Sequence, residues 1–514
     1  MRARFRNPCR GSNASHRLVP VAWSGHGSVT PPGLDRAAGP LQVGGVRRTW
    51  WIGLVTGCTA VAEPAPPSQP EGWRDEVSLA TRPDLDPAGE VVEVTLEAKV
   101  TGVEVHPGVT TELWTYEGTL PGPILRGKKG GRLLVHFTNH LPEPTTIHWH
   151  GLRVPAAMDG TEAVQAPIAP GESFDYDLPL LDAGTYWYHP HVRSSAQVGY
   201  GLYGMLIVDD DTEPMHLGDE LPLVFSDLGL DDEGVVRPGD ENGWFGDYFG
   251  REGNLLLING RVRPKVKARA GLPQRWRLVN AARSRYLKLV APGIEVVQIG
   301  SDGGLIEVPR RLDAVVLAPG ERMEVVATAP MAGVGRIPVR WEDTDRFHIG
   351  TPQAALPLFD LEVGPEAVVE VEPLPGRLRD VPELDLSQAL PRTIELTEMV
   401  EEGVGVLGIN GVAASHAELY HAHVGTTEVW TVENRTGYDH PFHLHGFFFQ
   451  PLMADRRPWP NREWKDTLHI PANSRLDFAV TYDDRPGMWM FHCHILDHAD
   501  LGMMAMLMVE RPHQ

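Results

Sequence analysis

Three short segments of the chain share one pattern of polar and apolar positions. They span residues 130–139, 271–280 and 425–434, and each begins with Gly and ends with Asn. The second half of each segment alternates between apolar and polar residues, which is the period of a half-buried β-strand. Self-similarity along a chain indicates repeated structural units. We therefore predict three related β domains.

Turn signals repeat between these segments. Pro-Gly-Glu occurs at 170–172 and 319–321, with Pro-Ala-Asn at 471–473, and Asn-Gly occurs at 259–260 and 410–411. The chain holds 54 Gly and 45 Pro in 514 residues, which favours many turns and therefore short strands. Short strands between turns predict a sandwich or barrel in each domain.

The repeats place the three domains at 88–212, 218–365 and 385–512. The length of 514 residues agrees, since a domain usually holds roughly 100–200 residues. Chance similarity among β-rich segments is the alternative interpretation. The spacing of the histidines described below argues against it.

The N-terminal residues differ in charge from the rest of the chain. Residues 1–58 hold eight Arg and one Asp, a balance of +7, so the total of −22 leaves −29 on the remainder. An acidic body argues against nucleic-acid binding, which needs clustered Lys and Arg. It favours metal ions or cationic substrates over anions.

Residues 1–58 are interpreted as a leader with an export signal. Arg47 and Arg48 precede a short apolar run and small residues. Residues 54–58 (LVTGC) resemble a bacterial lipoprotein cleavage box, which would make Cys58 a lipid anchor to the membrane. A twin-arginine signal and a disordered leader without a signal are the alternatives. We expect an exported protein of the periplasm or cell envelope, with a Pro-rich tether at 59–87.

Histidine pairs follow the first and third repeats at one spacing. Nine residues after the closing Asn come His-Trp-His at 148–150 and His-Leu-His at 443–445, whereas the second repeat has Leu289 there. Alternate residues of a strand point to the same face, so the imidazoles of a pair lie on one face. The second domain is therefore expected to carry no metal ligands.

A second set of pairs obeys the same rule. His-Pro-His at 189–191 and His-Cys-His at 492–494 each end seven residues after a Gly. The four pairs give eight imidazoles, four from each of two homologous domains, which could enclose a metal cluster between them. One such pair is weak evidence, because exposed strands carry them by accident. Four pairs in register across a duplication are strong evidence.

Cys493 is the single cysteine outside the leader, so it has no disulfide partner in the body of the chain. It points to the opposite strand face from the two histidines beside it. His440, three residues before the pair at 443–445, and His498 and Met503 downstream complete a set of ligands. A thiolate, two imidazoles and a weak axial thioether are typical of a blue-copper electron-transfer site. The alternative is an inert cysteine in a core strand.

The four motifs together resemble those of the multicopper oxidases, the family of laccases, bilirubin oxidases and bacterial copper-efflux oxidases, over residues 88–512. The resemblance implies an all-β fold class with three cupredoxin-like Greek-key β-barrel or sandwich domains in one chain. It also implies four copper ions: type 1, type 2 and a binuclear type 3 pair. Carried onto this chain, it assigns type 1 copper to His440, Cys493, His498 and Met503, type 2 copper to His148 and His443, and type 3 copper to His150, His189, His191, His445, His492 and His494.

The resemblance implies one-electron oxidation of a reducing substrate at the type 1 copper, coupled to four-electron reduction of O2 to water at the trinuclear cluster. The donor is expected to be a phenol or aromatic amine, with a cuprous, ferrous or manganous ion as the alternative. Residues 365–395 hold no Met-rich insertion of the kind found in copper-efflux relatives. A copper-binding or structural envelope protein without turnover is the non-enzymatic alternative. We expect a monomer that binds no nucleic acid.

The resemblance also assigns catalytic roles to Asp159 and Cys493. Asp159, in Met-Asp-Gly at 158–160, occupies the place of a family carboxylate that supplies protons to the cluster. The alternative for this residue is a turn Asp before Gly. Many bacterial relatives carry a Glu directly after the second type 1 histidine, but this chain has Ala499 there, followed by Asp500. Proton supply is therefore expected to depend more on Asp159.

Two further expectations concern the surroundings of the type 1 ligands. Asp439, Asp497 and Asp500 lie beside these ligands in the sequence and are expected to form an acidic rim. The methionine-rich run at 503–508 is interpreted as a ligand loop that continues into a core strand, with Met filling gaps.

Overall fold

A computed structural model describes residues 77–512, except 88, 90, 107, 216–218, 232, 237, 239–242, 332–334, 349, 351, 365–371, 402–403 and 415–416. The predicted leader, with Cys58, and most of the tether lie outside the described residues. The described residues belong to one compact unit. None of their helices is long and apolar enough to cross a membrane.

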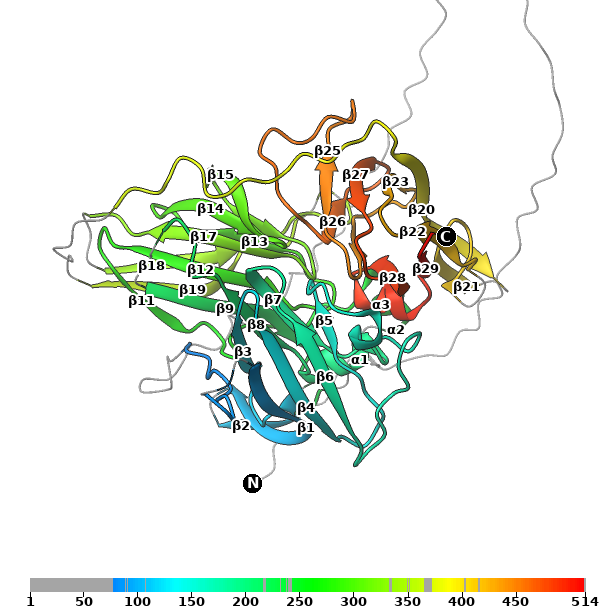
Figure 1. Cartoon of the computed structure of the whole chain (residues 1–514). Coiled ribbons are helices and arrows are strands. Elements are labelled where there is room, and N and C mark those ends of the chain that lie inside the picture. The colour runs from blue at the N-terminus through cyan, green and yellow to red at the C-terminus, as the bar shows by residue number, and fades with distance from the viewer. Residues whose placement is uncertain are drawn as a thin grey trace, which may run out of the picture. The chain divides into compact units, whose positions relative to one another are not determined.

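Strands dominate this part of the chain and form six sheets in three successive pairs. The first pair is built from β1 (Val91–His106), β2 (Val109–Tyr116), β3 (Gly122–Lys128), β4 (Arg132–His140), β5 (His148–His150), β6 (Ser173–Pro179), β7 (Gly184–His189) and β8 (Gly204–Asp209). Its sheets have the strand orders β2-β1-β4-β6 and β3-β8-β7-β5. In Figure 1 these strands run from blue to cyan-green.

The second pair contains the largest sheet. Its strands are β9 (Asp219–Leu228), β10 (Leu255–Ile258), β11 (Lys265–Arg269), β12 (Pro273–Asn280), β13 (Leu287–Val290), β14 (Glu295–Ser301), β15 (Gly304–Leu312), β16 (Val315–Leu317), β17 (Arg322–Thr328), β18 (Gly335–Trp341) and β19 (Leu356–Gly364). The orders are β10-β9-β12-β17-β14-β15 and β11-β19-β18-β13-β16.

The third pair ends close to the C-terminus. Its strands are β20 (Leu390–Glu401), β21 (Val404–Ile409), β22 (Tyr420–His423), β23 (Thr427–Asn434), β24 (His440–Leu444), β25 (Phe449–Leu452), β26 (Thr467–Ile470), β27 (Arg475–Thr481), β28 (Gly487–Cys493) and β29 (Met504–Glu510). The orders are β21-β20-β23-β27-β25 and β22-β29-β28-β24-β26. The helices are short: η1 (Ala156–Met158), α1 (Ser194–Tyr200), α2 (Gly243–Phe249) and α3 (Leu496–Asp500).

The three predicted repeats form the equivalent strands β4, β12 and β23. Each pairs in parallel with the first strand of its group, and antiparallel with β6, β17 or β27. The closing Asn makes the same type of side-chain hydrogen bonds in every copy. The side-chain amide of Asn139 donates to two backbone carbonyls, at 2.9 and 2.8 Å, and Asn280 and Asn434 repeat this pattern. A side chain thus satisfies buried carbonyls just before the metal-ligand strands of the first and third copies.

Each pair of sheets encloses its own apolar core, drawn from residues of that pair with few exceptions. The predicted all-β fold class is confirmed. The three pairs of sheets lie within residues 88–212, 218–365 and 385–512. These domain limits stay a prediction. Cys493 and Met503 are fully buried in the core of the third pair.

Candidate metal centre

The four histidine pairs come together through strand pairing. In the first group, His148 of β5 lies opposite His189 of β7. In the third group, His443 of β24 lies opposite His492 of β28 in the same antiparallel arrangement. Residues directly opposite in such a pair share one face of the sheet, so each group presents its imidazoles from one face.

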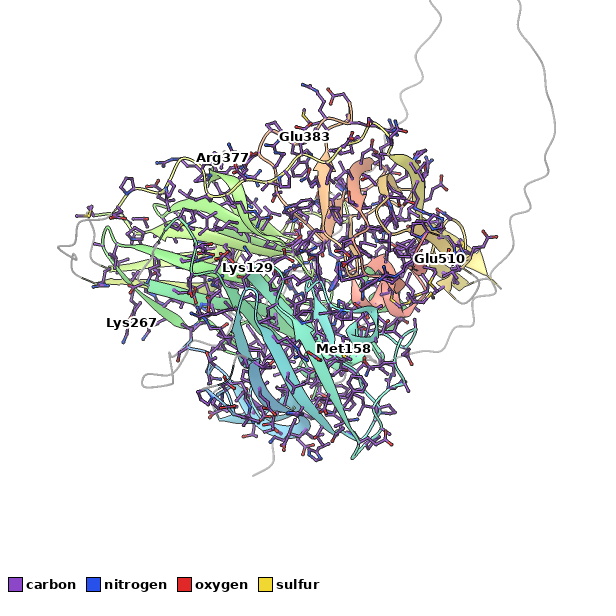
Figure 2. The ribbon with its side chains drawn as sticks, viewed as in Figure 1. Lys129, Met158, Lys267, Arg377, Glu383 and Glu510 are labelled. Atoms are coloured by element: carbon purple, nitrogen blue, oxygen red, sulfur yellow. The ribbon has the colours of Figure 1, made fainter. Side chains whose placement is uncertain are left out.

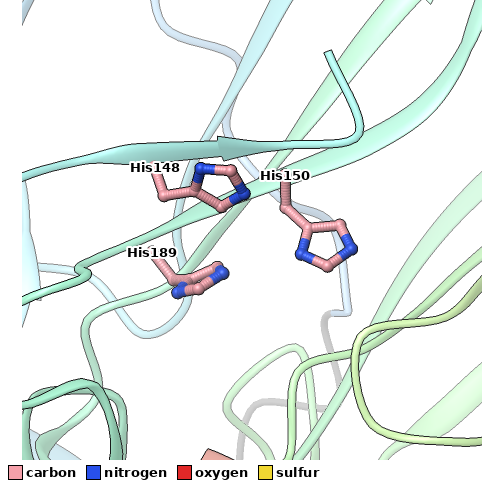
Figure 3. Close-up of side chains that lie close together, drawn as sticks. All are labelled: His148, His150 and His189. Carbon is pink, nitrogen blue, oxygen red and sulfur yellow. The ribbon is translucent and has the colours of Figure 1, made fainter. Parts of the chain in front are cut away.

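The two groups meet, and all eight imidazoles are buried. The rings of His148 and His445 stack at 3.9 Å between centres, and so do those of His150 and His443. Three sets each place three ligand nitrogens within 4.8 Å of one another: His148 with His150 and His189, His148 with His443 and His445, and His191 with His445 and His492. Figure 3 shows the first of these sets. His494 completes the cluster, with its ring centre 4.8 Å from that of His150.

The hydrogen bonds of these rings fit metal ligation. The Nδ1 atoms of His148, His443 and His189 lie 2.8, 2.9 and 3.0 Å from backbone carbonyl oxygens, to which they donate. Their Nε2 atoms are buried and have no hydrogen-bond partner within the described part of the chain. An N–H fixed by a carbonyl leaves the other nitrogen as a lone pair, which is how metal-binding histidines are held.

The protonation of the imidazoles also fits. Burial lowers the pKa of His191 to about 3, and burial lowers the pKa of His492 and His494 well below the usual range. Neutral imidazoles are the form that binds metals. Eight buried imidazoles, several with an unpaired ring nitrogen within the described part of the chain, fit a cluster of metal ions.

Asp159 contacts this cluster from the first group. Its backbone oxygen accepts from His148, and its Oδ2 lies 2.9 Å from Nδ1 of His445. The side chain is almost fully buried. The structure thus places Asp159 beside the cluster, and its role in proton supply stays a prediction.

Asp466 occupies the equivalent place on the other side, and the sequence analysis missed it. Its backbone oxygen accepts from His443, and its Oδ1 lies 3.2 Å from Nε2 of His150. Among the described residues, the buried Nδ1 of His150 has no hydrogen-bond partner, whereas in His148, His189 and His443 this atom is Nε2. The equivalence of the two residues is not visible in the sequence spacing. Asp159 follows its histidine pair closely, whereas Asp466 follows His443 after a long hairpin.

Asp466 belongs to a buried ionic network. Arg322 donates to both of its carboxylate oxygens, at 2.7 and 2.5 Å. Arg322 also donates to the backbone oxygens of Thr185 and Asp302, at 3.2 and 2.9 Å. Lys465 lies 2.9 Å from the Asp302 carboxylate. Arg322 is fully buried and joins all three groups of strands beside the histidine cluster.

A separate site surrounds Cys493. Its Sγ lies 3.3 Å from Nδ1 of His440 and 3.6 Å from Nδ1 of His498, and the two Nδ1 atoms are 3.2 Å apart. Met503 is fully buried in the same core cluster, and its backbone oxygen accepts from the Cys493 N–H at 3.0 Å. Burial raises the pKa of the Cys493 thiol well above its usual range, so this thiol ionises when a metal takes the proton's place.

The predicted acidic rim is wrong for two of its three members. Asp497 is 2 % exposed: it pairs with Arg251 and accepts from Ser195 Oγ at 2.6 Å. It thus ties α3, which carries His498, to the first and second groups. Asp439 is 4 % exposed, because it lies between two histidines. Only Asp500 is exposed. Asp439 and Asp497 are paired and buried beside the ligands, so these two add no acidic surface.

The interpretation of the methionine run also needs correction. Met503 does lie in the core, but Met504, Met506 and Met508 lie on the other, partly exposed face of β29. The core face is formed by the intervening residues Ala505, Leu507 and Val509. The run therefore does not fill gaps in the core of the third group.

Comparisons with known proteins agree with this geometry. Two family models described as multicopper oxidase match residues 97–213 and 385–513. The chain is 30% identical over 465 residues to the multicopper oxidase MmcO of Mycobacterium tuberculosis, covering 83% of this chain and 88% of that one. It is 27% identical to a laccase of Bacillus subtilis, covering 79% and 91%.

A solved structure gives the same result. The multicopper oxidase of Campylobacter jejuni, described as a metallo-oxidase, superposes with a TM-score of 0.76 at 31% identity, covering 84% of this chain and 94% of that one. The fold is thus confirmed as cupredoxin-like. The family implies copper as the metal and an oxidoreductase that uses O2 and a reducing substrate. From its strand pairing, its histidine clusters and these similarities, the chain belongs to the multicopper oxidase family.

Proposed function

We propose that this protein oxidises a small aromatic donor, a phenol or an aromatic amine, one electron at a time, with dioxygen as the terminal acceptor. One observation carries the proposal. Cys493, the last residue of β28, lies between His492 and His494 in the chain, so the thiolate site and the histidine cluster are joined by a few covalent bonds. An electron received at one site has a short bonded route to the other.

Four copper ions would be held by two sets of side chains. The type 1 ion would take His440, Cys493, His498 and Met503; the type 2 ion His148 and His443; the type 3 pair His150, His189, His191, His445, His492 and His494. When bound, the type 1 ion supplies one-electron oxidation of the donor, and the other three supply four-electron reduction of dioxygen to water. Soft sulfur ligands at one site and imidazoles at the other suit copper.

The protein's own groups prepare these sites before any metal binds. The carbonyl oxygens of Asp159 and Asp466 orient the type 2 histidines. Complete burial of Cys493 excludes water from the thiolate, and the Ile495 N–H donates to its Sγ at 3.4 Å. The ionised Asp159 carboxylate accepts from His445 at Oδ2, and its other oxygen can take up a proton and pass it toward the cluster.

An aromatic cluster beside the type 1 ligands supports an aromatic donor. Tyr438 contacts the rings of His440 and His498, at 4.8 and 5.6 Å between centres. Phe249 lies 5.4 Å from Tyr438 and 5.5 Å from Phe347, and both phenylalanines are partly exposed. A flat apolar ring can stack on such a surface close to the electron acceptor.

A metal-ion donor is the second candidate, and one contact favours it. Nε2 of His348 lies 2.6 Å from Oδ1 of Asp439, and Nε2 of His469 lies 2.9 Å from Oδ2. The side chains of His348 and His469 are 50 % and 36 % exposed, and Asp439 directly precedes His440. Two imidazoles and a carboxylate are ligands for borderline divalent ions. A non-enzymatic role finds support in a relative named cell division protein FtsP, from Proteus mirabilis, at 30% identity.

The test uses the full-length, copper-loaded protein. About four copper atoms per chain, intense absorption in the red, and oxygen consumption with a phenolic donor are expected. Parallel assays with ferrous, manganous and cuprous ions decide between the donor classes. About one metal atom per chain, or no red absorption, would contradict the four-copper assignment. Full copper content without oxygen consumption for any donor would favour the non-enzymatic role.

Replacing Met503 by Leu is expected to raise the type 1 reduction potential. A thioether stabilises the oxidised copper more than an apolar side chain does, and the axial ligand tunes this potential. Leu has nearly the volume of Met, so the buried position should tolerate it. Redox titration of the red absorption band measures the shift. A lower potential in Met503→Leu would show that Met503 is not the axial ligand.

A further inference from the structure

Five methionines form a continuous stripe on one face of the β28–β29 hairpin. The antiparallel register places Met488 opposite Met508, Met490 opposite Met506, and His492 opposite Met504. Directly opposite residues share a face, and so do alternate residues of one strand. The stripe, named here the methionine ladder, consists of Met488, Met490, Met504, Met506 and Met508.

The ladder lies on the same sheet face as the histidine cluster. His492 stands at its inner end and belongs to that cluster. The neighbouring strand β24 adds His443 opposite His492, and the His445 N–H donates to the Met490 carbonyl at 2.9 Å. At the outer end, β22 places the exposed His421 next to Met508, close to Glu510, which is labelled in Figure 2. Thioethers therefore lead from an exposed edge to the cluster.

The fold does not require methionine at the places of Met488, Met490 and Met508, whereas Met205 occupies the place equivalent to Met506. The hairpin β7–β8 is the counterpart of β28–β29 in the first group. Gly184 and His189 of β7 correspond to Gly487 and His492 of β28. There Thr185 lies opposite Ile207, and Trp187 lies opposite Met205. Thr185 and Trp187 thus stand where the third group has Met488 and Met490. A gap-filling role is also weak for four of the five, since Met488, Met504, Met506 and Met508 are partly exposed.

The inner end of the ladder opens into a cavity of about 460 Å³. Met490 and Met504 line it together with His191, the cluster histidine with the greatest exposure at 8 %. Glu162 and Asp500 line the same cavity, and so do Arg193 and Arg251, which pair with carboxylates. The helix η1, whose Met158 is labelled in Figure 2, contacts β28. A small soft cation could thus meet two sulfur atoms and an imidazole in one space.

We propose that the methionine ladder binds a cuprous ion at its inner end, between Met490 and Met504, and passes it to the histidine cluster. Thioethers are soft ligands that select monovalent copper over divalent hard ions. Partial exposure of Met504 lets an ion enter from solvent. Met490 and Met504 are not among the ligands assigned above, although the cluster ligand His191 lines the same cavity. Delivery to the cluster rests on the proposed function, whereas binding of the ion does not.

The binding test uses the copper-loaded, full-length protein and silver(I), an ion of the same charge and softness that does not turn over. The wild type is expected to bind at least one silver ion, and Met490→Leu/Met504→Leu is expected to weaken this binding at least tenfold in a calorimetric titration. Leu keeps the volume of Met, so the fold should persist. The matched control is Met331→Leu/Met453→Leu, which removes two exposed thioethers elsewhere and should bind silver like the wild type. Equal silver binding by the ladder variant and the wild type would overturn the proposal.

The delivery test follows copper loading of full-length protein depleted of copper. With cuprous ion supplied without oxygen, the ladder variant is expected to gain cluster copper several-fold more slowly than the wild type and the matched control, to the same final content. Loading at the wild-type rate would overturn delivery. Failure of all three proteins to hold cluster copper would instead count against the proposed function and leave the silver result unaffected.

Discussion

Replacing Asp159 by Asn should lower the rate of oxygen consumption by about 10²-fold or more, the usual contribution of a positioned acid or base. Asn keeps the shape of the side chain, and its amide oxygen can still accept from His445 Nδ1. The backbone oxygen that orients His148 is unchanged. Copper binding should therefore persist, while the carboxylate that relays protons to the cluster is lost. Burial opposes the charge on Asp159, but His445 and His148 lower its pKa well below the usual range.

Two measurements separate proton supply from loss of the site. Copper content and the rate of type 1 reduction without oxygen should match the wild type, because Asp159 does not contact Cys493 or its ligands. Asp455→Asn, on an exposed turn beside Arg457, is the matched control and should leave the copper content and both rates unchanged. Normal oxygen consumption in Asp159→Asn would show that Asp159 does not supply protons. Loss of copper would show that its role is purely structural.

Local patterns predicted the strands well. The closing Asn of each repeat marks a strand end because its amide serves nearby carbonyls in all three copies. The Asn-Gly turns at 259–260 and 410–411 have positive φ at both residues, as their composition indicates. The first copy has the same turn at Glu117 and Gly118, with φ of 57° and 77°. Sequence reading missed it, because Glu seldom adopts this conformation.

The site was predictable where strand register alone places a residue, and not where distant segments meet. The histidine pairs follow from alternation along single strands. Asp466 contacts a histidine of the first group, and Arg322 contacts residues of all three groups. The spacing of residues along the sequence therefore could not predict the place of either side chain. Asp497 looked like a surface residue because charged side chains usually are. Its partner Arg251 lies in another group of strands and could be found only in the folded structure.

Replacing Arg322 by Met should produce the largest loss of stability. Arg322 is fully buried and compensates the carboxylate of Asp466 with two hydrogen bonds. Burial disfavours the ionised form of Asp466, but Arg322 lowers its pKa well below the usual range. Removing one partner of a buried ion pair leaves an uncompensated charge and typically costs about 3–5 kcal/mol. The free energy of unfolding, from denaturant titration of the copper-free protein, should fall by this amount.

The comparison with two other variants tests the cause. Arg435→Met removes an exposed arginine that pairs with Glu395 and Glu433, and surface ion pairs of this kind contribute about 0–1 kcal/mol. Arg322→Lys keeps the charge but not the paired N–H donors, so its loss should fall between the two. Because Asp466 orients His443 and contacts His150, Arg322→Met should also weaken retention of cluster copper against a chelator. Equal stability of Arg322→Met and Arg435→Met would show that the buried network does not hold the three groups of strands around the cluster.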